Sequence, residues 1–137
     1  MKIVVMDAQG GGLGRMIVEQ LRKTLPDQSV MAVGTNAAAT ANMLKGGADR
    51  AATGENAVRV NARDADLILA PIGMLLCDGM MGEVTAAMAL AVGRSPAHRI
   101  LIPTGRCGIH VAGTEARPMA ELVSLAAAEA MKFIREA

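Results

Sequence analysis

The chain has 137 residues and a mass of 14.1 kDa, the size of a single domain. Hydrophobic residues make up 52% and charged residues 20%, which is enough apolar material for a core and excludes both disorder and a disulfide scaffold. The balance of 14 Lys and Arg against 13 Asp and Glu, with no Trp, no Tyr and one Phe, excludes a nucleic-acid partner, which would need a basic face or stacking rings.

The lengths of the apolar stretches indicate the cellular location of the protein. The first stretch is interrupted at Asp7, which is too early for a secretion signal. The most apolar stretch, residues 67–77, is well short of the roughly 20 residues that span a bilayer. Cys77 and Cys107 lie far apart with no second ligand pair nearby. We therefore expect a cytoplasmic protein with reduced thiols, no membrane contact and no metal site.

The first 33 residues predict a βαβ unit. Residues 2–6 are a β-branched run, residues 9–14 are rich in glycine, and the apolar residues that follow have helical spacing. Pro26 ends this helix, and residues 29–33 predict a second strand. Such a unit has a right-handed crossover and parallel strands.

The rest of the chain continues this alternation. Helices are expected at residues 36–45, 55–63 and 81–92, and strands at residues 49–52, 66–70 and 99–103. Residues 108–112 follow the last of these too closely for a crossover, so they predict an antiparallel hairpin strand. Pro118 opens a final amphipathic helix. The fold class is therefore α/β, a single doubly wound Rossmann-like domain over residues 1–137 with a mostly parallel sheet.

The glycine-rich loop is the main candidate for a binding site. The start of a helix presents free backbone N–H groups and the positive end of the helix dipole, which attract a pyrophosphate. Glycines at Gly10 and Gly12 let a phosphate approach the backbone, and Gly14 permits close packing of helix on strand. The spacing departs from the dinucleotide fingerprint, because Arg15 stands where its third glycine would be. A loop that only turns the chain is the alternative, and a loop plugged by the protein's own side chains would argue against a diphosphate.

The segment from Ala8 to Arg15 resembles the glycine loop of short-chain dehydrogenases and Rossmann-fold oxidoreductases. Gly12 and Gly14 match the paired glycines of those families, and Arg15 matches the basic residue that often follows them, whereas Ala8 replaces the first glycine. Over its whole length the chain is similar to a small bacterial family known only as a domain of unknown function. That resemblance implies a Rossmann-like fold and no established activity.

Two departures limit the dehydrogenase resemblance. NAD-specific sites place an acidic residue after the second strand, where this chain has Gly34, Thr35 and Asn36. Thr35 and Asn36 could instead donate to a ribose or a 2′-phosphate, or cap the next helix, and capping is the more common role. Short-chain dehydrogenases also work through a Tyr, which this chain lacks.

A ligand in a doubly wound sheet lies at the carboxyl ends of the strands where the strand order reverses. The second wall of that crevice is expected at Pro71, Ile72 and Gly73, and Arg106 follows a later strand at the same rim. Asp7 lies beside the loop, where it either accepts N–H groups of its own loop or holds a hydroxyl.

Four residues are candidates for acid, base or nucleophile chemistry: Asp78, Glu83, Glu55 and Cys77. Glu83 and Glu55 lie where helices are expected to start, and a carboxylate there stabilises the helix dipole without any catalytic role. The uncharged run between Val84 and Val92 predicts a helix that is apolar on every side and that one sheet cannot cover, hence a homo-oligomer.

The sequence therefore predicts a small module that binds a nucleotide or dinucleotide, with NADP as one candidate. The expected site residues are Asp7, Gln9, Gly10, Gly11, Gly12, Leu13, Gly14, Arg15, Gly34, Thr35, Asn36, Pro71, Ile72, Gly73 and Arg106. An oxidoreductase or transferase completed at a subunit interface by Asp7, Asp78, Glu83 or Cys77 is one alternative. A structural partner subunit with an empty loop is the other.

Overall fold

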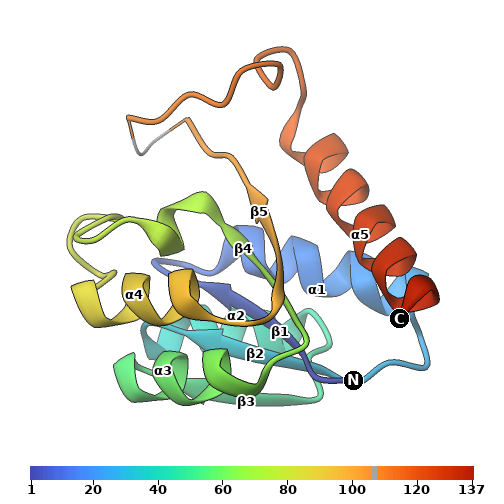
Figure 1. The fold of residues 1–137 in the computed structure, drawn as a ribbon, viewed down its shortest axis with the longest axis horizontal. Helices are drawn as coiled ribbons and strands as arrows, with labels where there is room; N and C mark the ends of the chain where they lie inside the picture. The colour runs from blue at the N-terminus through green and yellow to red at the C-terminus, as the bar shows by residue number, and fades with distance from the viewer. Residues whose placement is uncertain (106–107) are drawn as a thin grey trace.

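A computed structural model describes residues 1–105 and 108–137 (Figure 1). Its sheet contains five strands, and their order is β3-β2-β1-β4-β5. The strands are β1 (Ile3–Asp7), β2 (Val30–Gly34), β3 (Arg50–Thr53), β4 (Leu67–Pro71) and β5 (His98–Ile102). All four pairings between them are parallel, which confirms the doubly wound α/β fold.

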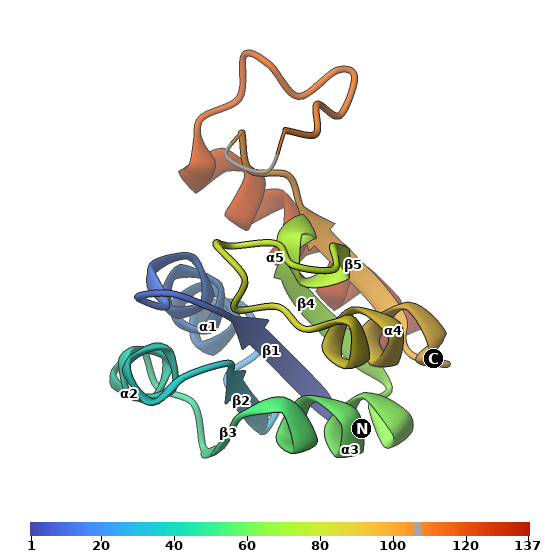
Figure 2. The ribbon, with the colours of Figure 1, turned by 90° about the vertical axis from the view of Figure 1, so that its left-hand side faces the viewer.

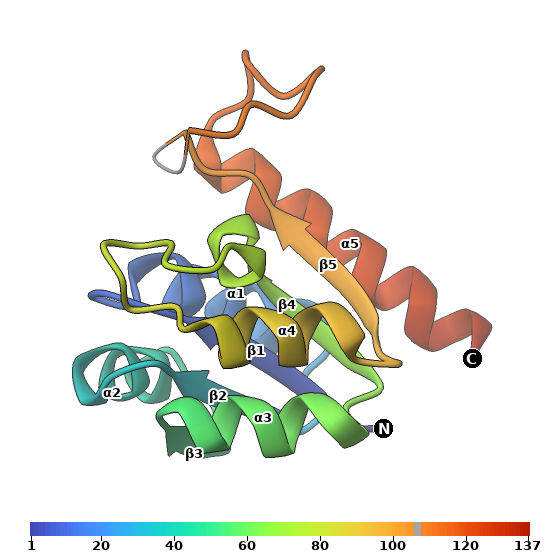
Figure 3. The same ribbon diagram turned by 60° about the vertical axis from the view of Figure 1, so that its left-hand side comes forward.

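Five α-helices connect and cover the strands. They are α1 (Gly12–Thr24), α2 (Ala37–Lys45), α3 (Glu55–Asp64), α4 (Ala86–Arg94) and α5 (Met119–Glu136), with a short 3₁₀ turn η1 (Ile72–Leu75) after β4. Helices α1, α2 and α5 pack on one face of the sheet, and α3 and α4 pack on the other (Figures 2 and 3). The molecule therefore has three layers.

The alternation of side chains in the central strands produces two cores. In β1, Ile3 and Val5 point into the core under α1 and α5, whereas Val4 and Met6 point into the core under α3 and α4. All five residues of β1 are buried, as are all five of β4. Both faces of these strands are covered, and this is why their sequences are continuous apolar runs rather than alternating ones.

Two expectations from the sequence were wrong. Residues 108–112 form no strand, and every residue of this segment except the partly buried Val111 is exposed. Closeness to the preceding strand in the sequence suggested a hairpin, but the segment lies away from the sheet (Figures 1 and 3). The helix expected at residues 81–92 begins only at Ala86, because Thr85 caps it by accepting the N–H of Met88 at 3.1 Å.

The two-core packing gives a stability prediction. Replacing Leu21 of α1, which is fully buried, with Ala is expected to lower the free energy of unfolding by roughly 2–5 kcal/mol, because it leaves a cavity against β1 and α5. The matched control is Leu44→Ala on α2, where the side chain is 44% exposed and the expected loss is below about 1 kcal/mol. Urea unfolding of both variants measures the difference, and equal losses would contradict the assignment of Leu21 to the core.

Candidate functional site

The strand order reverses between β1 and β4, so the crevice of this fold opens at their carboxyl ends. The glycine loop leaves β1 there, and Gly11 ends it as the residue before helix α1. Gly11 has a φ of 73°, and a Cβ at this position would lie 2.6 Å from the carbonyl oxygen of Ala39 in α2. Only glycine fits this backbone and this close approach.

The other glycines of the site either allow close packing of neighbouring elements or have open space where a side chain would be. A Cβ on Gly14 would meet the sulfur of Met43 at 2.6 Å, which agrees with the expected close packing of α1. A Cβ on Gly34 would lie 2.6 Å from the backbone nitrogen of Thr40. Gly10 and Gly12 have no atom within 4 Å of that position, so a ligand could approach their backbone.

The carboxylate of Asp7 holds the loop from inside. Its two oxygens accept the N–H groups of Ala8 and Gly14, each at 2.7 Å, and the side chain is only 5% exposed. Burial raises the pKa of Asp7 above its ordinary value of 3.8, against the lowering effect of these two N–H groups, and the charge of Glu83 raises the pKa further. Asp7 therefore has the local role that was one of its two expected readings.

A second carboxylate, that of Glu83, closes the loop from outside. Its Oε1 accepts the N–H of Gln9 at 2.8 Å, the hydroxyl of Thr35 at 2.8 Å and the side-chain amide of Asn36 at 2.7 Å. We call this group of three donors the carboxylate seat. Burial alone would raise the pKa of Glu83, but the hydrogen bonds from Gln9, Thr35 and Asn36 lower it below the ordinary value of 4.5.

The segment that carries Glu83, residues 76–85, crosses from the end of η1 to the start of α4, and we call it the strap. Three of its non-glycine residues have positive φ angles: Asp78 at 63°, Met80 at 54° and Met81 at 59°. Such backbone conformations cost on the order of 1–3 kcal/mol each and persist only where other contacts impose them. The hydrogen bonds of Glu83 are the contacts that tie the strap to the loop.

The loop keeps some free donors. The N–H of Gly11 donates to the carbonyl of Ala8. The N–H groups of Ala8 and Gly14 donate to Asp7, and that of Gln9 donates to Glu83. Within the described residues, no hydrogen bond is found for the N–H groups of Gly10, Gly12 and Leu13. These three donors lie at the amino end of a 13-residue helix, where the helix dipole is positive.

The other expected site residues have these positions. The Arg15 guanidinium bonds Glu19 and Asn42 at 3.0 Å each. Asn36 caps α2 by accepting the N–H of Ala39 at 2.9 Å, which confirms the capping interpretation. Arg106 and Cys107 lie outside the described residues.

Pro71 ends β4, and Ile72 and Gly73 begin η1, which puts this wall at the carboxyl edge as expected. The strap covers it, because a Cβ on Gly73 would lie 2.6 Å from the terminal methyl of Met80. Glu55 lies in the first turn of α3, as expected, and accepts the Thr85 hydroxyl at 2.6 Å. Cys77 is exposed, and burial followed by the charge of Asp78 raises its pKa, which keeps the thiol protonated at neutral pH.

Sequence reasoning did not find the carboxylate seat. Glu83 was expected at a helix start, yet it binds a backbone group 74 positions earlier in the chain. The one signal in the sequence is an acidic residue that follows a glycine and precedes the uncharged residues 84–93.

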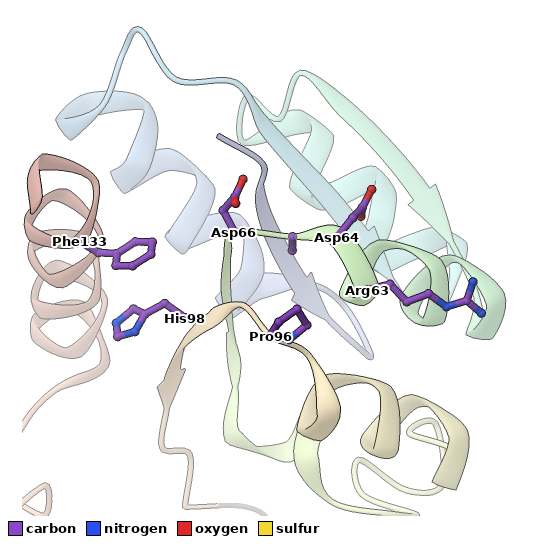
Figure 4. A pocket seen from close by; sticks show the side chains of 7 residues that line it. Arg63, Asp64, Asp66, Pro96, His98 and Phe133 are labelled. Atoms are coloured by element: carbon purple, nitrogen blue, oxygen red, sulfur yellow. The ribbon is translucent and has the colours of Figure 1, made fainter. Parts of the chain in front are cut away.

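A separate hollow of about 520 Å³ lies at the opposite, amino-terminal edge of the sheet (Figure 4). His98 stacks on Phe133 there with ring centres 4.6 Å apart. Its two acidic residues are already occupied, since Asp64 pairs with the Lys2 ammonium and Asp66 accepts the Lys2 backbone N–H, both at 2.6 Å. This hollow shares no residue with the glycine loop.

In the described residues, no group of three or more His, Cys, Asp or Glu side chains is placed to hold a metal ion. None of the described helices combines the length and the hydropathy that crossing a membrane requires.

The fold and the seat define an α/β protein with a parallel, doubly wound sheet and an anion-accepting group of donors at its carboxyl edge. More particularly, the chain belongs to the family described as "Domain of unknown function (DUF3842)", whose model matches residues 2–135. No curated protein matches the sequence.

Among solved structures, the fold is similar to that of a dodecameric FMN-dependent UbiX-like decarboxylase from Escherichia coli O157:H7. The TM-score is 0.50 and the sequence identity 14%, over 96% of this chain and 94% of that one. At this identity the similarity concerns the fold.

The loop geometry gives a matched pair of glycine variants. Gly11→Ala is expected to lower the free energy of unfolding by more than about 1 kcal/mol, because its positive φ and the backbone of Ala39 both oppose a side chain. Gly12→Ala places a methyl group in open space at the first helical residue and is expected to be neutral or slightly stabilising. Thermal unfolding of both proteins decides this, and an unaffected Gly11→Ala protein would rule out the described loop.

The lowered pKa of Glu83 gives a pH dependence. A carboxyl group with a lowered pKa in the folded state adds stability above its ordinary value of 4.5 and loses that contribution as the pH falls through its folded value. The stability difference between wild type and Glu83→Gln should therefore be largest at neutral pH and shrink in acid.

Urea unfolding at a series of pH values measures this difference, with Glu19→Gln as a control for the loss of an exposed charge. A difference for Glu83→Gln that does not change with pH would contradict the carboxylate seat.

Proposed function

We propose that this protein binds a phosphate-bearing ligand of the nucleotide type at the glycine loop, in exchange for the Glu83 carboxylate. The observation that carries the proposal is the carboxylate seat, in which donors from the ends of β1 and β2 converge on one anionic oxygen. Donors that converge on a carboxylate oxygen have the geometry to bind a phosphate oxygen as well.

The free donors of the loop extend this seat. The N–H groups of Gly10, Gly12 and Leu13 follow Gln9 in the chain at the amino end of α1, and the Cβ positions of Gly10 and Gly12 are open. A phosphate that replaced the Glu83 carboxylate would meet both sets of donors and the positive end of the helix dipole. With Glu83 in place, its negative charge opposes an anion, so binding requires the strap to move.

The strap can move as a unit. Its turn is held by hydrogen bonds of its own, such as that from the Asp78 N–H to the Val84 carbonyl at 2.7 Å, so release of the Glu83 side chain leaves the turn intact. The proposal is thus an exchange of one anion for another, with Glu83 as the internal competitor.

FMN is the first ligand to test, because the solved protein with a similar fold is named as FMN-dependent. The Glu83 side chain plugs the loop, which is the observation that counts against the diphosphate expected from the sequence. FMN carries one terminal phosphate, which suits a seat built around one oxygen better. NADP has no support beyond the partial glycine pattern, and serves as the comparison ligand.

The residues named for the enzyme alternative give it no support. The Cys77 thiol is protonated at neutral pH, and the carboxylates of Asp7 and Glu83 are already occupied by N–H and O–H donors of the protein. The third named carboxylate, Asp78, lies exposed on the strap. The partner-subunit alternative, with an unused loop, is what a failed titration would favour.

Self-association also remains a proposal. Helix α4 buries Met88 and Val92 against the sheet and turns Leu90 outward with 51% exposure. The outward face agrees with the homo-oligomer expected from the run between Val84 and Val92. The similar solved protein is a dodecamer, which supports this proposal without fixing the contact.

Calorimetric titration with FMN tests the exchange. Glu83→Gln keeps the size of the side chain and removes the competing charge, so it is expected to bind FMN at least about tenfold more tightly than the wild type. Gly12→Asp places a carboxylate at the open donor row and is expected to abolish binding. Glu19→Gln removes an exposed charge from α1 and should leave the affinity unchanged.

NADP, ADP and inorganic phosphate in the same titrations separate a phosphate seat from recognition of the flavin. Tighter binding to Glu83→Gln for all four ligands would indicate that the phosphate alone is recognised. No binding of any of them to wild type or Glu83→Gln at millimolar concentration would overturn the proposal.

A further inference from the structure

A groove between α3 and α4, on the face of the sheet that α5 does not cover, has a volume of about 400 Å³. Three arginines line it, Arg59 and Arg63 from α3 and Arg94 from α4. Figure 3 shows these two helices side by side. Ala87, Leu90 and Ala91 of α4 supply its apolar lining. We call this surface the arginine groove.

The charges of the arginine groove are not neutralised. Arg59, Arg63 and Arg94 have neither an ion pair nor a hydrogen bond with any residue that the structure describes, and no acidic residue lines the groove. Figure 4 shows the side chain of Arg63 extending away from Asp64 and Asp66. Three guanidinium groups in one concave surface attract carboxylates and bind them with two parallel hydrogen bonds.

The apolar part of the lining favours a partner that also carries an apolar side chain. Leu90, in the lining of the groove, is 51% exposed. Alanines beside Leu90 leave room for a side chain from outside. A small anion would neutralise the arginines and leave Leu90 in water, so the surface suits a protein segment that carries an apolar side chain between acidic ones.

The groove cannot pair with itself. In a two-fold symmetric contact the same patch meets its own copy, which would bring these arginines against one another. Like charges in such a contact cost several kcal/mol. The contact must therefore be with a different surface.

The same chain carries a surface of the required kind on α5. Glu121, Leu125 and Glu129 follow one another at four-residue spacing on the outer side of this helix, and Leu125 is 49% exposed. Glu121 pairs with Arg117, and Glu129 lies 3.8 Å from His98, both on the exposed surface, where such pairs contribute little. Lys132 lies one turn beyond this acidic stripe.

Helices α3 and α4, which carry the arginine groove, pack on the opposite face of the sheet from α5, which carries the acidic stripe (Figure 2). The two surfaces therefore point away from each other within one copy. We infer that the arginine groove binds the acidic stripe of α5 from a second copy of this chain, with Leu125 seated beside Leu90 and its flanking carboxylates on the arginines. A contact between two different surfaces repeats from copy to copy and builds a ring or a filament rather than a dimer.

Charge reversal tests this contact in the full-length protein. The variant Arg59→Glu/Arg94→Glu and the variant Glu121→Arg/Glu129→Arg each place like charges on both sides, so each is expected to be monomeric, with self-association weakened at least about tenfold. In an equimolar mixture the acidic groove of one variant meets the basic stripe of the other, and the assembly should return. Circular dichroism of each variant confirms that it is folded.

Light scattering and sedimentation from micromolar to millimolar concentration give the readout. The control Lys23→Glu/Lys45→Glu makes the same charge change on α1 and α2 and should assemble like the wild type. A monomeric wild type, assembly that survives in either variant, or a mixture that stays monomeric would each overturn the inference. None of these outcomes depends on ligand binding at the glycine loop.

Discussion

One carboxylate oxygen joins the segments at the carboxyl edge of the sheet. Oε1 of Glu83 gathers a backbone N–H after β1 and two side chains after β2, although Glu83 itself follows β4. The three strands are neighbours in the sheet, so this atom joins the segments that leave their carboxyl ends. At this partly buried site the three donors stabilise the charged form of the carboxylate. The shape of the loop and the path of the strap both depend on this atom.

Much of the fold could be predicted from local patterns. The apolar runs of β1 and β4, the spacing of Ile17, Val18 and Leu21 in α1, and Pro118 before α5 each determine an element through the residues themselves. These patterns succeed because the cores of a doubly wound sheet are built from contiguous apolar residues. Residues 108–112 show the limit. Their alternating Ile109 and Val111 have the period of a strand, but a strand also needs a neighbour with free hydrogen-bonding groups, which a local pattern cannot reveal.

The candidate site was only half predictable. The position of the glycine loop follows from the fold class, and the packing role of Gly14 follows from its place at the start of α1. The hydrogen bonds from Glu83 to the loop do not follow from the fold class, because the partner of a single acidic residue is determined by three-dimensional proximity and not by its spacing in the sequence. Glu83 sits near the expected start of a helix, and a dipole interaction was the natural local explanation. The actual helix starts at Ala86, and the strap that results carries Glu83 to the loop instead.

The two acidic residues at this edge differ in what their removal would change. Asp7 joins Ala8 and Gly14 through its own side chain, so it fixes both ends of the loop with contacts that never leave the segment 7–14. The loop thus keeps its curvature whether the strap is docked or released. A ligand bound as proposed would meet a loop whose conformation these bonds already fix, so little conformational entropy would be lost on binding. The rate of binding would therefore be limited by the departure of the strap and not by a conformational change of the loop.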